Sequence, residues 1–492
     1  MPDSFLFRAD ASTEIGTGHV MRCLAIAQAA QDAGYSTTFV MAKEANGLIG
    51  RIKENNCEVV EIKSERGSLD DAKETADLAK KLNAHCIVDG YAFADEYQKA
   101  LKDSGIQFLL VDDYGQATEY HADFILNQNS YAESLREIYS NRSDGSELLL
   151  GSEYVMLRRE FRKINSNPSV PNKAKSILIT LGGSDPDNVT HRIVKLLSTI
   201  EGINATVVVG GMNLYLNDIK ESAKGMNVLT DVKDMPSLIS GAELAITAGG
   251  STTYEMAYMG VPTIAITIAN NQRPVTADLH ERGVVKSIGH PDEFSDDDFL
   301  ACVSDLIANE TKRKSMSEKG QKLIDGYGAY RVCMKVSGKK MWLRPSKDND
   351  CKMIFEWAND PEARAASFNS DPIPWEDHVN WYNQKMTDEN HHFFVAVNED
   401  NESIGQVRFE VEGNNAAISV SIDPNQRGKG YGIDLIAKGC ERVFAVTNAN
   451  VVDAYIKPNN EASKAVFIKA GFEESAKTEI KEQPAEHYIL AK

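Results

Sequence analysis

Two periods of hydrophobic and polar positions alternate along the first third of the chain. Short apolar runs, such as Phe5–Arg8 and Ser36–Met41, are separated by segments that are apolar every three to four residues, such as Val20–Ala33 and Leu69–Leu82. The short runs are typical of buried strands, and the longer segments are typical of amphipathic helices. Strands that alternate with helices in this way predict a parallel α/β sheet.

A polar stretch interrupts this pattern, and a second α/β set follows it. Residues 157–175 read LRREFRKINSNPSVPNKAK and contain Pro168 and Pro171, which favours a linker. The runs SILITLGG, ATVVVGG, LAITAGG and PTIAIT then predict further strands. We expect two doubly wound domains, 1–150 and 151–335, with a cleft between them. Ligands of such sheets bind beyond the carboxyl ends of the strands.

The segment MWLRPSKDND, which begins at Met341, opens a third unit that we place at 341–492. Its boundary with the second domain falls around Tyr327–Lys340. A chain of 492 residues agrees with three domains at ~150 residues each. There is no low-complexity segment and no repeat with a solenoid period.

Charge and cysteine usage narrow the class of protein. The net charge is −19, which argues against sequence-independent binding of nucleic acid, since that requires a basic face. The seven cysteines form no CxxC pair, which argues against a zinc or redox motif. Their odd number and their dispersal along the chain favour a reducing compartment. The first residues do not have the pattern of a signal peptide, and no apolar run reaches the ~18 residues of a membrane span. We therefore expect a cytoplasmic protein without a nucleic-acid or membrane partner.

The first candidate site is the stretch Arg8–Cys23, RADASTEIGTGHVMRC, between a predicted strand and a predicted helix. Gly16 and Gly18 let the backbone approach a ligand, and the free N–H groups of a helix start attract anions. His19 lies at this helix start, where the helix dipole favours a neutral imidazole that can act as a general base. The alternative is that His19 only caps the helix. Asp10 either orients His19, binds sugar hydroxyls or caps the loop.

The second candidate site is the segment Ala248–Glu255, AGGSTTYE. Gly249 and Gly250 free the backbone, and the hydroxyls that follow suit a pyrophosphate at a helix start. Glu255, one turn further on, suits the hydroxyls of a ribose. The alternative is an ordinary capped helix in which Thr252 and Glu255 form a capping box, but that alternative does not explain the two glycines.

These motifs, in this order, resemble one family. RADAS, IGTGHVMRCLAIA, VDGY, VDDY, ILNQN, TLGGSD and AGGSTTYE are similar to the UDP-sugar hydrolases of pseudaminic acid biosynthesis, over about residues 4–335. The resemblance implies a GT-B fold, that is, two Rossmann-like domains with a cleft between them. It implies hydrolysis of UDP-2,4-diacetamido-2,4,6-trideoxy-β-L-altrose to the free sugar and UDP, without a metal. At Gly90 the chain departs from the family, which often has a histidine there.

The resemblance also implies roles for individual residues. His19 corresponds to the proposed base that activates water. The remaining residues implied to bind the UDP-sugar are Asp10, Gly16, Gly18, Gly249, Gly250, Ser251, Thr252, Glu255, Asn271 and Gln272. For Asn271 and Gln272 the alternative is a polar turn.

A glycine-rich segment in the third unit predicts a second phosphate cradle. Gln426–Gly432, QRGKGYG, follows a predicted strand and opens a helix. It resembles motif A of the GNAT acetyltransferases, and Lys457–Phe472 resembles a later motif of that family. The resemblance, over about residues 341–492, implies a GNAT α/β acetyltransferase domain with acetyl-CoA as co-substrate. The implied cofactor-binding residues are Ile422, Arg427, Gly428, Lys429, Gly430, Tyr431, Gly432, Asn459 and Asn460.

The general acid of this domain stays open, because Phe467 occupies the position at which many members have tyrosine. The candidates for the acid are Glu410, Ser421 and Tyr455, each of which has a structural alternative. Trp357–Tyr382 resembles the segment of acetyltransferases that act on nucleotide-linked amino sugars, although Ala358 replaces a frequent arginine. Arg364 and His378 either contact the nucleotide or are surface residues.

Together the two resemblances imply consecutive steps on one UDP-linked amino sugar: acetylation of its 4-amino group, then release of UDP. Three alternatives remain. The first half is a glycosyltransferase with an acceptor other than water, or it is a non-catalytic nucleotide-sugar binder with a tethered acetyltransferase. In the third alternative, the acetyltransferase domain acts on protein amines or other amines. The sequence does not determine the oligomeric state or the stereochemistry of the sugar.

Overall fold

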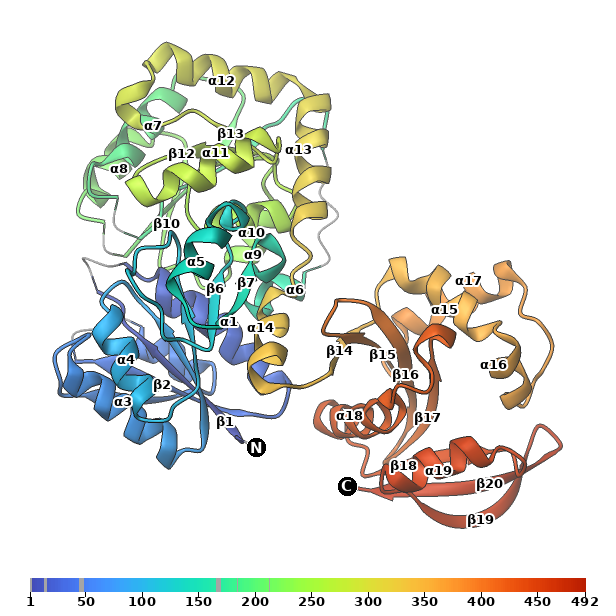
Figure 1. Cartoon of the computed structure of the whole chain (residues 1–492). Helices are drawn as coiled ribbons and strands as arrows, with labels where there is room; N and C mark the ends of the chain where they lie inside the picture. The colour runs from blue at the N-terminus through green and yellow to red at the C-terminus, as the bar shows by residue number, and fades with distance from the viewer. Residues whose placement is uncertain (1, 13–15, 44–47, 165–169, 184, 212) are drawn as a thin grey trace. The chain divides into compact units, whose positions relative to one another are not determined.

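The computed structural model describes residues 2–12, 16–43, 48–164, 170–183, 185–211 and 213–492. The chain forms two compact units, Met1–Ser337 and Gly338–Lys492 (Figure 1). The first unit contains two parallel sheets in tandem, which confirms the α/β prediction for this half. Pro168, from the predicted linker, lies outside the described residues.

Seven parallel strands form the first sheet, in the order β3-β2-β1-β4-β5-β6-β7. They are β1 (Ser4–Ala9), β2 (Ser36–Ala42), β3 (Glu58–Ile62), β4 (Ala84–Asp89), β5 (Phe108–Val111), β6 (Phe124–Asn127) and β7 (Glu147–Leu150). The helices of this lobe are α1 (Gly18–Asp32), α2 (Ile49–Glu54), α3 (Leu69–Lys81), α4 (Asp95–Asp103), η1 (Ala132–Leu135) and α5 (Arg136–Arg142). The chain order reverses between β1 and β4, and such a switch point opens a crevice beyond the strand ends.

The helix α3 illustrates why these segments fold as they do. The side chain of Ser68 caps the helix by accepting from the N–H of Asp71. Acidic residues occupy its first turn and lysines its last turn, as the helix dipole favours. Its apolar face packs against the strands in a core that includes Ala72, Ala76 and Val88.

Six parallel strands form the second sheet, in the order β10-β9-β8-β11-β12-β13. They are β8 (Ser176–Thr180), β9 (Asn204–Val209), β10 (Asn227–Thr230), β11 (Leu244–Ala248), β12 (Thr263–Ile266) and β13 (Val285–Ser287). The helices are α7 (Val189–Leu197), α8 (Leu216–Ser222), α9 (Met235–Ser240), α10 (Thr252–Tyr258), η3 (Asn270–Gln272), α11 (Arg273–Glu281), η4 (Pro291–Glu293), α12 (Asp296–Ala308) and α13 (Glu310–Leu323).

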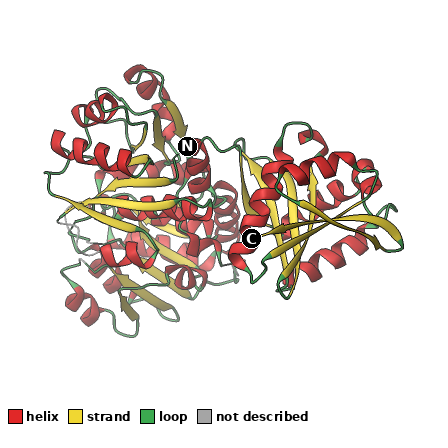
Figure 2. Cartoon of the chain, turned by 90° about the horizontal axis from the view of Figure 1, so that it is seen from below, coloured by secondary structure: helices red, strands yellow, loops and turns green. Residues whose placement is uncertain are grey.

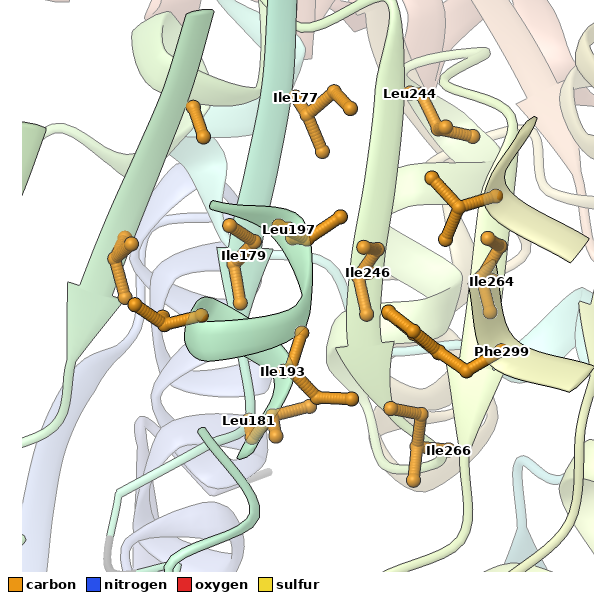
Figure 3. Packing of buried hydrophobic residues seen from close by; sticks show 14 of the residues in the cluster. Ile177, Ile179, Leu181, Ile193, Leu197, Leu244, Ile246, Ile264, Ile266 and Phe299 are labelled. Atoms are coloured by element: carbon orange, nitrogen blue, oxygen red, sulfur yellow. The ribbon is translucent and has the colours of Figure 1, made fainter. Parts of the chain in front are cut away.

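Side chains that alternate along the strands of this sheet pack into two hydrophobic cores, one on each face. Ile177 and Ile179 pack with Phe299 of α12 on one face, as Figure 3 shows, while Leu178 packs with Met256 of α10 on the other. Successive residues of a strand point to opposite faces, so a strand covered on both faces is apolar throughout. The continuous run SILIT therefore marks an interior strand.

The connection between the two lobes is packed rather than extended. It carries η2 (Ser152–Tyr154) and α6 (Arg159–Arg162), and Leu157 and Phe161 are buried. The chain then returns to the first lobe through α14 (Gly328–Ser337), which packs against α1. A Cβ on Gly328 would lie 2.3 Å from the carbonyl oxygen of Val155, so only glycine permits this close crossing.

The second unit has one mixed sheet in the order β14-β15-β16-β17-β18-β20-β19. The strands are β14 (Met341–Pro345), β15 (His391–Asn398), β16 (Ser403–Glu412), β17 (Asn415–Ile422), β18 (Val451–Ile456), β19 (Glu473–Ile480) and β20 (Gln483–Ala491). The helices are η5 (Asp348–Asp350), α15 (Cys351–Ala358), α16 (Pro361–Ala366), α17 (Trp375–Thr387), η6 (Pro424–Gln426), α18 (Tyr431–Val446) and α19 (Glu461–Lys469). Figure 2 shows these strands with helices beside them.

Only one pair of neighbouring strands in this sheet is parallel, β17 with β18. Val407 of β16 and Val452 of β18 share a core with Leu435 of α18. A separate core on the other face joins Phe393 of β15 to Tyr382 of α17. The sheet therefore lies between α18 on one face and α17 on the other.

Candidate functional site

The first site is centred on His19, at the start of α1. Its Nδ1 atom lies 2.7 Å from Oδ1 of Asp89, the last residue of β4. Strands β1 and β4 are paired in parallel, with Ala9 opposite Asp89, so both strands end at the same edge of the sheet. The Asp89 side chain is fully buried and that of His19 is 9% exposed, so the pair is largely shielded from water.

Arg22, one turn after His19 on α1, holds two carboxylates. Its Nε donates to Oδ2 of Asp89 at 2.6 Å, and its Nη1 donates to Oδ1 of Asp113 at 2.7 Å. Burial alone raises the pKa of Asp89, but the charge of Arg22 and the hydrogen bonds from Arg22 and His19 outweigh this and hold that pKa well below its usual range. Burial also raises the pKa of Asp113, but the charge of Arg22 outweighs this effect, so the pKa of Asp113 is lowered. Both carboxylates are therefore ionised.

The ionised state of Asp89 fixes the tautomer of His19. A carboxylate has no proton to donate, so at 2.7 Å the proton must belong to Nδ1 of the imidazole. In the neutral ring the other nitrogen, Nε2, then keeps its lone pair. This is the arrangement by which an aspartate prepares a histidine to accept a proton.

Tyr91 joins this cluster to the second lobe. Its ring packs edge-on against His19, with centroids 4.8 Å apart, and its hydroxyl donates to Oδ2 of Asp113 at 2.8 Å. The Nδ2 atom of Asn271, in η3, lies 3.5 Å from that hydroxyl. Burial raises the pKa of Tyr91, and the charge of Asp113 raises it further, so the hydroxyl stays protonated.

A small cavity of about 40 Å³ opens beside the histidine, lined by residues that include Asp10, His19, Asp89 and Tyr91. One water molecule needs roughly 10–15 Å³ of such volume and two to four polar partners. The cavity therefore has room for a water molecule next to His19. A larger cavity, of about 250 Å³, lies against the same Gly90–Phe93 loop and includes Gln98 in its lining.

Asp10, Gly16 and Gly18 take different places around this cavity. Asp10 lines it, but its carboxylate pairs with Arg8 at 2.7 Å and accepts from the N–H of Ala42 at 2.7 Å. The aspartate that contacts His19 is Asp89. Gly16 has φ +73°, and a Cβ on Gly18 would meet no atom of the described residues within 4 Å.

Gly90 has a structural reason to be glycine in this chain. Its φ is +153°, and a Cβ there would lie 2.9 Å from the ring of Phe93. A side chain at this position would displace Phe93, over which the guanidinium of Arg8 is stacked at 4.8 Å. The departure from the family pattern at Gly90 is thus matched by the packing of its surroundings.

The second lobe presents Gly249–Glu255 at the carboxyl end of β11. A Cβ on Gly249 would lie 2.2 Å from Cγ2 of Thr276, so this glycine serves the packing of α11. Gly250 has no such neighbour, since its closest contact is Nε2 of Gln272 at 4.0 Å. Packing therefore accounts for one of the two glycines, and Gly250 keeps room for a ligand.

The hydroxyls and the carboxylate of this segment do not form the capping box considered from the sequence. Ser251 is exposed and is the N-cap residue of α10, without a side-chain capping bond, while Thr252 is half-buried. Glu255 instead accepts from Nη2 of Arg158 at 2.9 Å. Arg158, in the connection between the lobes, is buried and stacks on Phe161.

Asn271 and Gln272 differ in their surroundings. The side chain of Gln272 folds back, and its Oε1 accepts from the N–H of Ile268 at 3.0 Å. Asn271 is exposed and faces Tyr91 of the first lobe. Of the two, only Asn271 is placed by these contacts beside the His19 cluster.

Sequence reasoning did not assign roles to four members of this cluster, Arg22, Asp89, Tyr91 and Asp113. A usable signal was present in VDGY and VDDY, because Asp89 is the last residue of a buried strand and Asp113 lies just beyond the next one. Polar residues at the carboxyl ends of parallel strands meet at one edge of the sheet. Within the described residues, no group of three or more His, Cys, Asp or Glu side chains could hold a metal ion.

The second unit presents the glycine-rich segment between β17 and α18. Gly428 and Gly430 have φ +76° and +88°, and a Cβ on either would meet no atom within 4 Å. Gly430 is the N-cap residue of the sixteen-residue helix α18, so free N–H groups of Tyr431 and Gly432 stand at an open helix start. Ile422 ends β17 just before this segment.

The charged residues of this segment already have protein partners. Arg427 pairs with Asp360 and Glu362 at 2.6 and 2.8 Å, and Lys429 donates to Oε1 of Gln426 at 2.8 Å. The groups of this segment without a protein partner of this kind are therefore backbone N–H groups at the start of α18 rather than the two charged side chains. Asn459 is exposed, while Asn460 caps α19 by accepting from the N–H of Ser463.

The three candidates for the general acid lie on β16, β17 and β18. Glu410 pairs with Lys385 at 2.9 Å, and Ser421 accepts from Gln406 at 3.0 Å. The ring of Tyr455 is 38% exposed and stacks on His487. Phe467 packs against Phe472 in the core, so its position holds no proton donor.

Arg364 and His378 have structural partners. The guanidinium of Arg364 donates to the carbonyl oxygens of Ala358 and Asn369, which stabilises the loop after α16. His378 is buried, and its Nε2 lies 3.0 Å from the carbonyl oxygen of Cys351. Burial lowers the pKa of His378, which keeps the ring neutral inside an aromatic cluster.

Comparison with known proteins agrees with the geometry of the second unit. Residues 340–473 match the model of the family described as an acetyltransferase (GNAT) domain. The second unit is a GNAT domain. Solved structures similar to it include the spermidine N-acetyltransferase of Vibrio cholerae in complex with CoA and spermine, at 19% identity over 31% of this chain and 95% of that chain, with a TM-score of 0.29.

The first unit is similar to a UDP-sugar hydrolase and to a polysaccharide biosynthesis protein. The UDP-2,4-diacetamido-2,4,6-trideoxy-beta-L-altropyranose hydrolase of Campylobacter jejuni is 25% identical over 284 residues, 56% of this chain and 96% of that protein. A spore coat polysaccharide biosynthesis protein of Bacillus subtilis is 22% identical over 66% of this chain and 95% of its own length. A Methanocaldococcus jannaschii protein is 23% identical over 81% of each chain and thus extends into the GNAT domain. Within the described residues, no helix is both long and apolar enough to cross a membrane.

Proposed function

We propose that the first unit hydrolyses a UDP-linked 2,4-diacetamido-2,4,6-trideoxy sugar to the free sugar and UDP. The observation that carries this proposal is the His19–Asp89 pair beside a cavity with room for one water molecule. Nε2 of His19 takes a proton from that water as its oxygen bonds to the anomeric carbon. The bond from that carbon to the UDP oxygen breaks, and UDP leaves with the electron pair.

The second lobe supplies the nucleotide end of the site in this proposal. Gly250 and Ser251 precede the first helical turn of α10, where free N–H groups stabilise the charge that grows on the departing diphosphate. Glu255 is held in place by Arg158 and is 14% exposed, so it remains accessible to ribose hydroxyls. Asn271 brings this lobe within reach of Tyr91, beside the proposed base.

We propose that the GNAT domain transfers the acetyl group of acetyl-CoA to the 4-amino group of the UDP-linked precursor of that sugar. The open helix start at Gly430–Gly432 suits the pyrophosphate of CoA, and it lies directly beyond the end of β17. The same sugar then carries two acetamido groups when it reaches the first unit. One chain would thus perform two consecutive steps in the biosynthesis of a pseudaminic-type sugar acid.

The decisive experiment supplies a UDP-linked 4-amino-4,6-dideoxy sugar to the full-length protein, with and without acetyl-CoA, and follows UDP and free sugar by NMR. We expect the free diacetamido sugar only when acetyl-CoA is present. His19→Gln should abolish UDP release but leave acetylation intact, and His121→Gln, in the same lobe, serves as the control. UDP release that requires an added sugar acceptor would instead show a glycosyltransferase. Tight binding of the UDP-sugar without turnover would show a binding protein.

A further inference from the structure

The parallel strands β17 and β18 of the GNAT domain separate part of the way along their length. They pair only from Asn415 opposite Val451 to Ala417 opposite Asp453. Beyond these pairs β17 continues to Ile422 and β18 to Ile456, with no ladder between them. The sheet therefore has a split that is closed at Ala417–Asp453 and open toward the glycine-rich segment.

Helix α16 is tied to both strands at the open end of this split. Asp360, just before the helix, pairs with Arg427 beyond the end of β17. The carbonyl oxygen of Ala365, near its last residue, accepts from Nζ of Lys457 beyond the end of β18, at 3.0 Å. The helix therefore spans the two strand ends.

A histidine and an aspartate lie at the closed end. Nε2 of His487, on β20, lies 2.8 Å from Oδ1 of Asp453, the last residue of β18 that pairs with β17. The other oxygen of Asp453 accepts from Nδ2 of Asn415 at 2.8 Å. Tyr455 stacks on the imidazole with centroids 4.8 Å apart and planes inclined by 15°. Asp453 is thus fixed on two sides, and it fixes His487.

Cross-strand pairing places this group on the α17 face of the sheet. Asp453 pairs with Ala417, and Ala417 pairs with Glu410, whose carboxylate accepts from Lys385 of α17. Val452 and Ala454, the neighbours of Asp453 along β18, pack in the core on the α18 face instead. The acetyl-CoA cradle at the start of α18 and the His487–Asp453 pair are thus linked by the split.

Asp453 is the charged group that contacts His487 among the described residues. His487 pairs with Tyr455 on β18 and with Ala476 on β19. Ala485 and Ile489, which flank His487 on the same face of β20, carry no titratable group, nor does Thr478, opposite Ala485. Glu473, opposite Ile489 on β19, is an exposed carboxylate on this face. The bond from Asp453 to Nε2 leaves Nδ1 of the neutral ring with its lone pair, and the His487 side chain is 20% exposed.

We propose that His487, oriented by Asp453, is the general base of the acetyl transfer. The assignment rests on the proposed function for the use of acetyl-CoA. From Ile422 to Ala417 the strand rises by ~17 Å, at ~3.3 Å per residue. A pantetheine arm that follows β17 from the cradle into the split therefore presents its thioester near Asp453 and His487.

The proton balance of the step follows from this placement. Nδ1 of His487 takes one proton from the acceptor ammonium, and the freed lone pair forms a C–N bond to the thioester carbon. The C–S bond breaks, and the CoA thiolate leaves and takes up a second proton, which comes from the nitrogen of the acceptor. The amide keeps the third proton, and His487 releases its own to water. Phe467 plays no part in this route, since it carries no proton donor.

The test compares the full-length wild type with His487→Gln and His392→Gln. His392 pairs with Phe409 and lies on the α18 face, so it controls for the loss of a histidine from the same sheet. Release of CoA is followed from pH 6 to 9 with three acceptors: the UDP-linked 4-amino sugar, ethanolamine and hydroxylamine. Hydroxylamine is a far weaker base than the two amines, so above about pH 7 it is mostly neutral and does not need a base to free its lone pair; its rates are compared in that part of the range.

With the two ammonium acceptors, His487→Gln should lower kcat by about 100-fold or more and remove the rise of kcat with pH. The hydroxylamine rate and the KM for acetyl-CoA should stay within a few-fold of the wild type. Equal losses with all three acceptors, or activity equal to that of His392→Gln, would overturn the proposal. Wild-type activity toward ethanolamine but not toward the UDP-sugar would refute the proposed substrate alone.

A second measurement needs no acceptor, so it tests His487 even when the true acceptor is unknown. In ¹⁵N-histidine-labelled protein, addition of CoA should shift the ring resonances of His487, identified from their absence in His487→Gln, and leave those of His392 in place. If CoA binds without any change at His487, the base assignment is wrong whatever the acceptor is.

Discussion

The Nδ1 atom of His19 lies 2.7 Å from Oδ1 of Asp89, although the two residues are 70 positions apart in the chain. The contact exists because β1 and β4 are neighbours in a parallel sheet and end at the same edge. It gives His19 a defined tautomer before any substrate binds. The first prediction tests this relationship.

Asp89→Asn should lower kcat for UDP release by roughly 10²–10⁴-fold, because general-base catalysis contributes about that much. The asparagine amide can donate to Nδ1 of His19, which would move the ring proton to Nε2 and remove the base. Steady-state kinetics of UDP release provide the measurement. Asp70→Asn, an exposed substitution on α3, should behave as wild type. A kcat for Asp89→Asn within threefold of wild type would contradict the dyad.

Tyr91→Phe removes a hydroxyl that donates to Asp113 and lies 3.5 Å from Nδ2 of Asn271. The phenyl ring can keep its edge-on contact with His19, so we expect the melting temperature to change little. The rate of UDP release should fall by about 10-fold or more, since a positioned hydrogen bond to a charged group is worth roughly 1.5–3 kcal/mol. Tyr114→Phe, on the neighbouring loop, is the matched control. An active Tyr91→Phe enzyme would restrict the hydroxyl to a structural role.

Gly249→Ala and Gly250→Ala should separate packing from ligand binding. The new Cβ at position 249 would lie 2.2 Å from Thr276, and such overpacking costs about 1–3 kcal/mol of unfolding free energy. At position 250 the Cβ has room, so stability should be kept while the affinity for UDP falls. Thermal unfolding and calorimetric UDP titration measure the two effects. If Gly250→Ala lost stability but kept its affinity for UDP, a ligand role for Gly250 would be refuted.

Gly430→Ala and Gly432→Ala make a similar pair in the GNAT domain. Gly430 has φ +88°, where an alanine costs about 1–3 kcal/mol and distorts the helix start. At Gly432 the backbone is not in this region, and the new Cβ would lie 3.3 Å from Cγ1 of Val466. We expect Gly430→Ala to raise the KM for acetyl-CoA several-fold more than Gly432→Ala. Similar KM values for both variants would argue against the cradle.

The stability of the GNAT domain should fall as the pH drops below neutrality. Burial, with the charges of Arg408 and Lys385, lowers the pKa of His391 to about 4. The unfolded chain binds this proton near pH ~6.5 and the folded one only near 4, so acid favours unfolding across that window. The four tryptophans, Trp342, Trp357, Trp375 and Trp381, all lie in this domain, so their fluorescence follows its unfolding alone.

His391→Phe should flatten the decline in stability between pH 6.5 and 4, because it removes this titration and suits the surrounding rings of Trp381 and Phe393. Burial also lowers the pKa values of His378 and His392, so part of the decline should remain. Urea unfolding at pH 7 and 4.5 provides the measurement. An unchanged slope in His391→Phe would show that other groups control the acid sensitivity.

Local patterns in the sequence predicted the helices and strands well. The apolar segment Val20–Ala33 corresponds to α1 (Gly18–Asp32), and the run SILIT corresponds to β8 (Ser176–Thr180). The prediction of a linker after Gly151 missed its packing, since Leu157 and Phe161 are buried against the lobes. A mostly polar segment gives no sequence signal for such packing, because a few buried apolar residues are enough to hold the connection against the lobes.

By itself, the sequence determined the α/β periodicity, the three glycine-containing segments and the position of His19 at a helix start, since these depend on neighbours within a few residues. The tertiary structure alone decided the partners: Asp89 for His19, Arg158 for Glu255 and Asp453 for His487. It also decided that Gly249 serves packing and that Gly250 does not. Strand order and register bring distant residues to one edge of a sheet, and neither can be read from the local pattern of a chain.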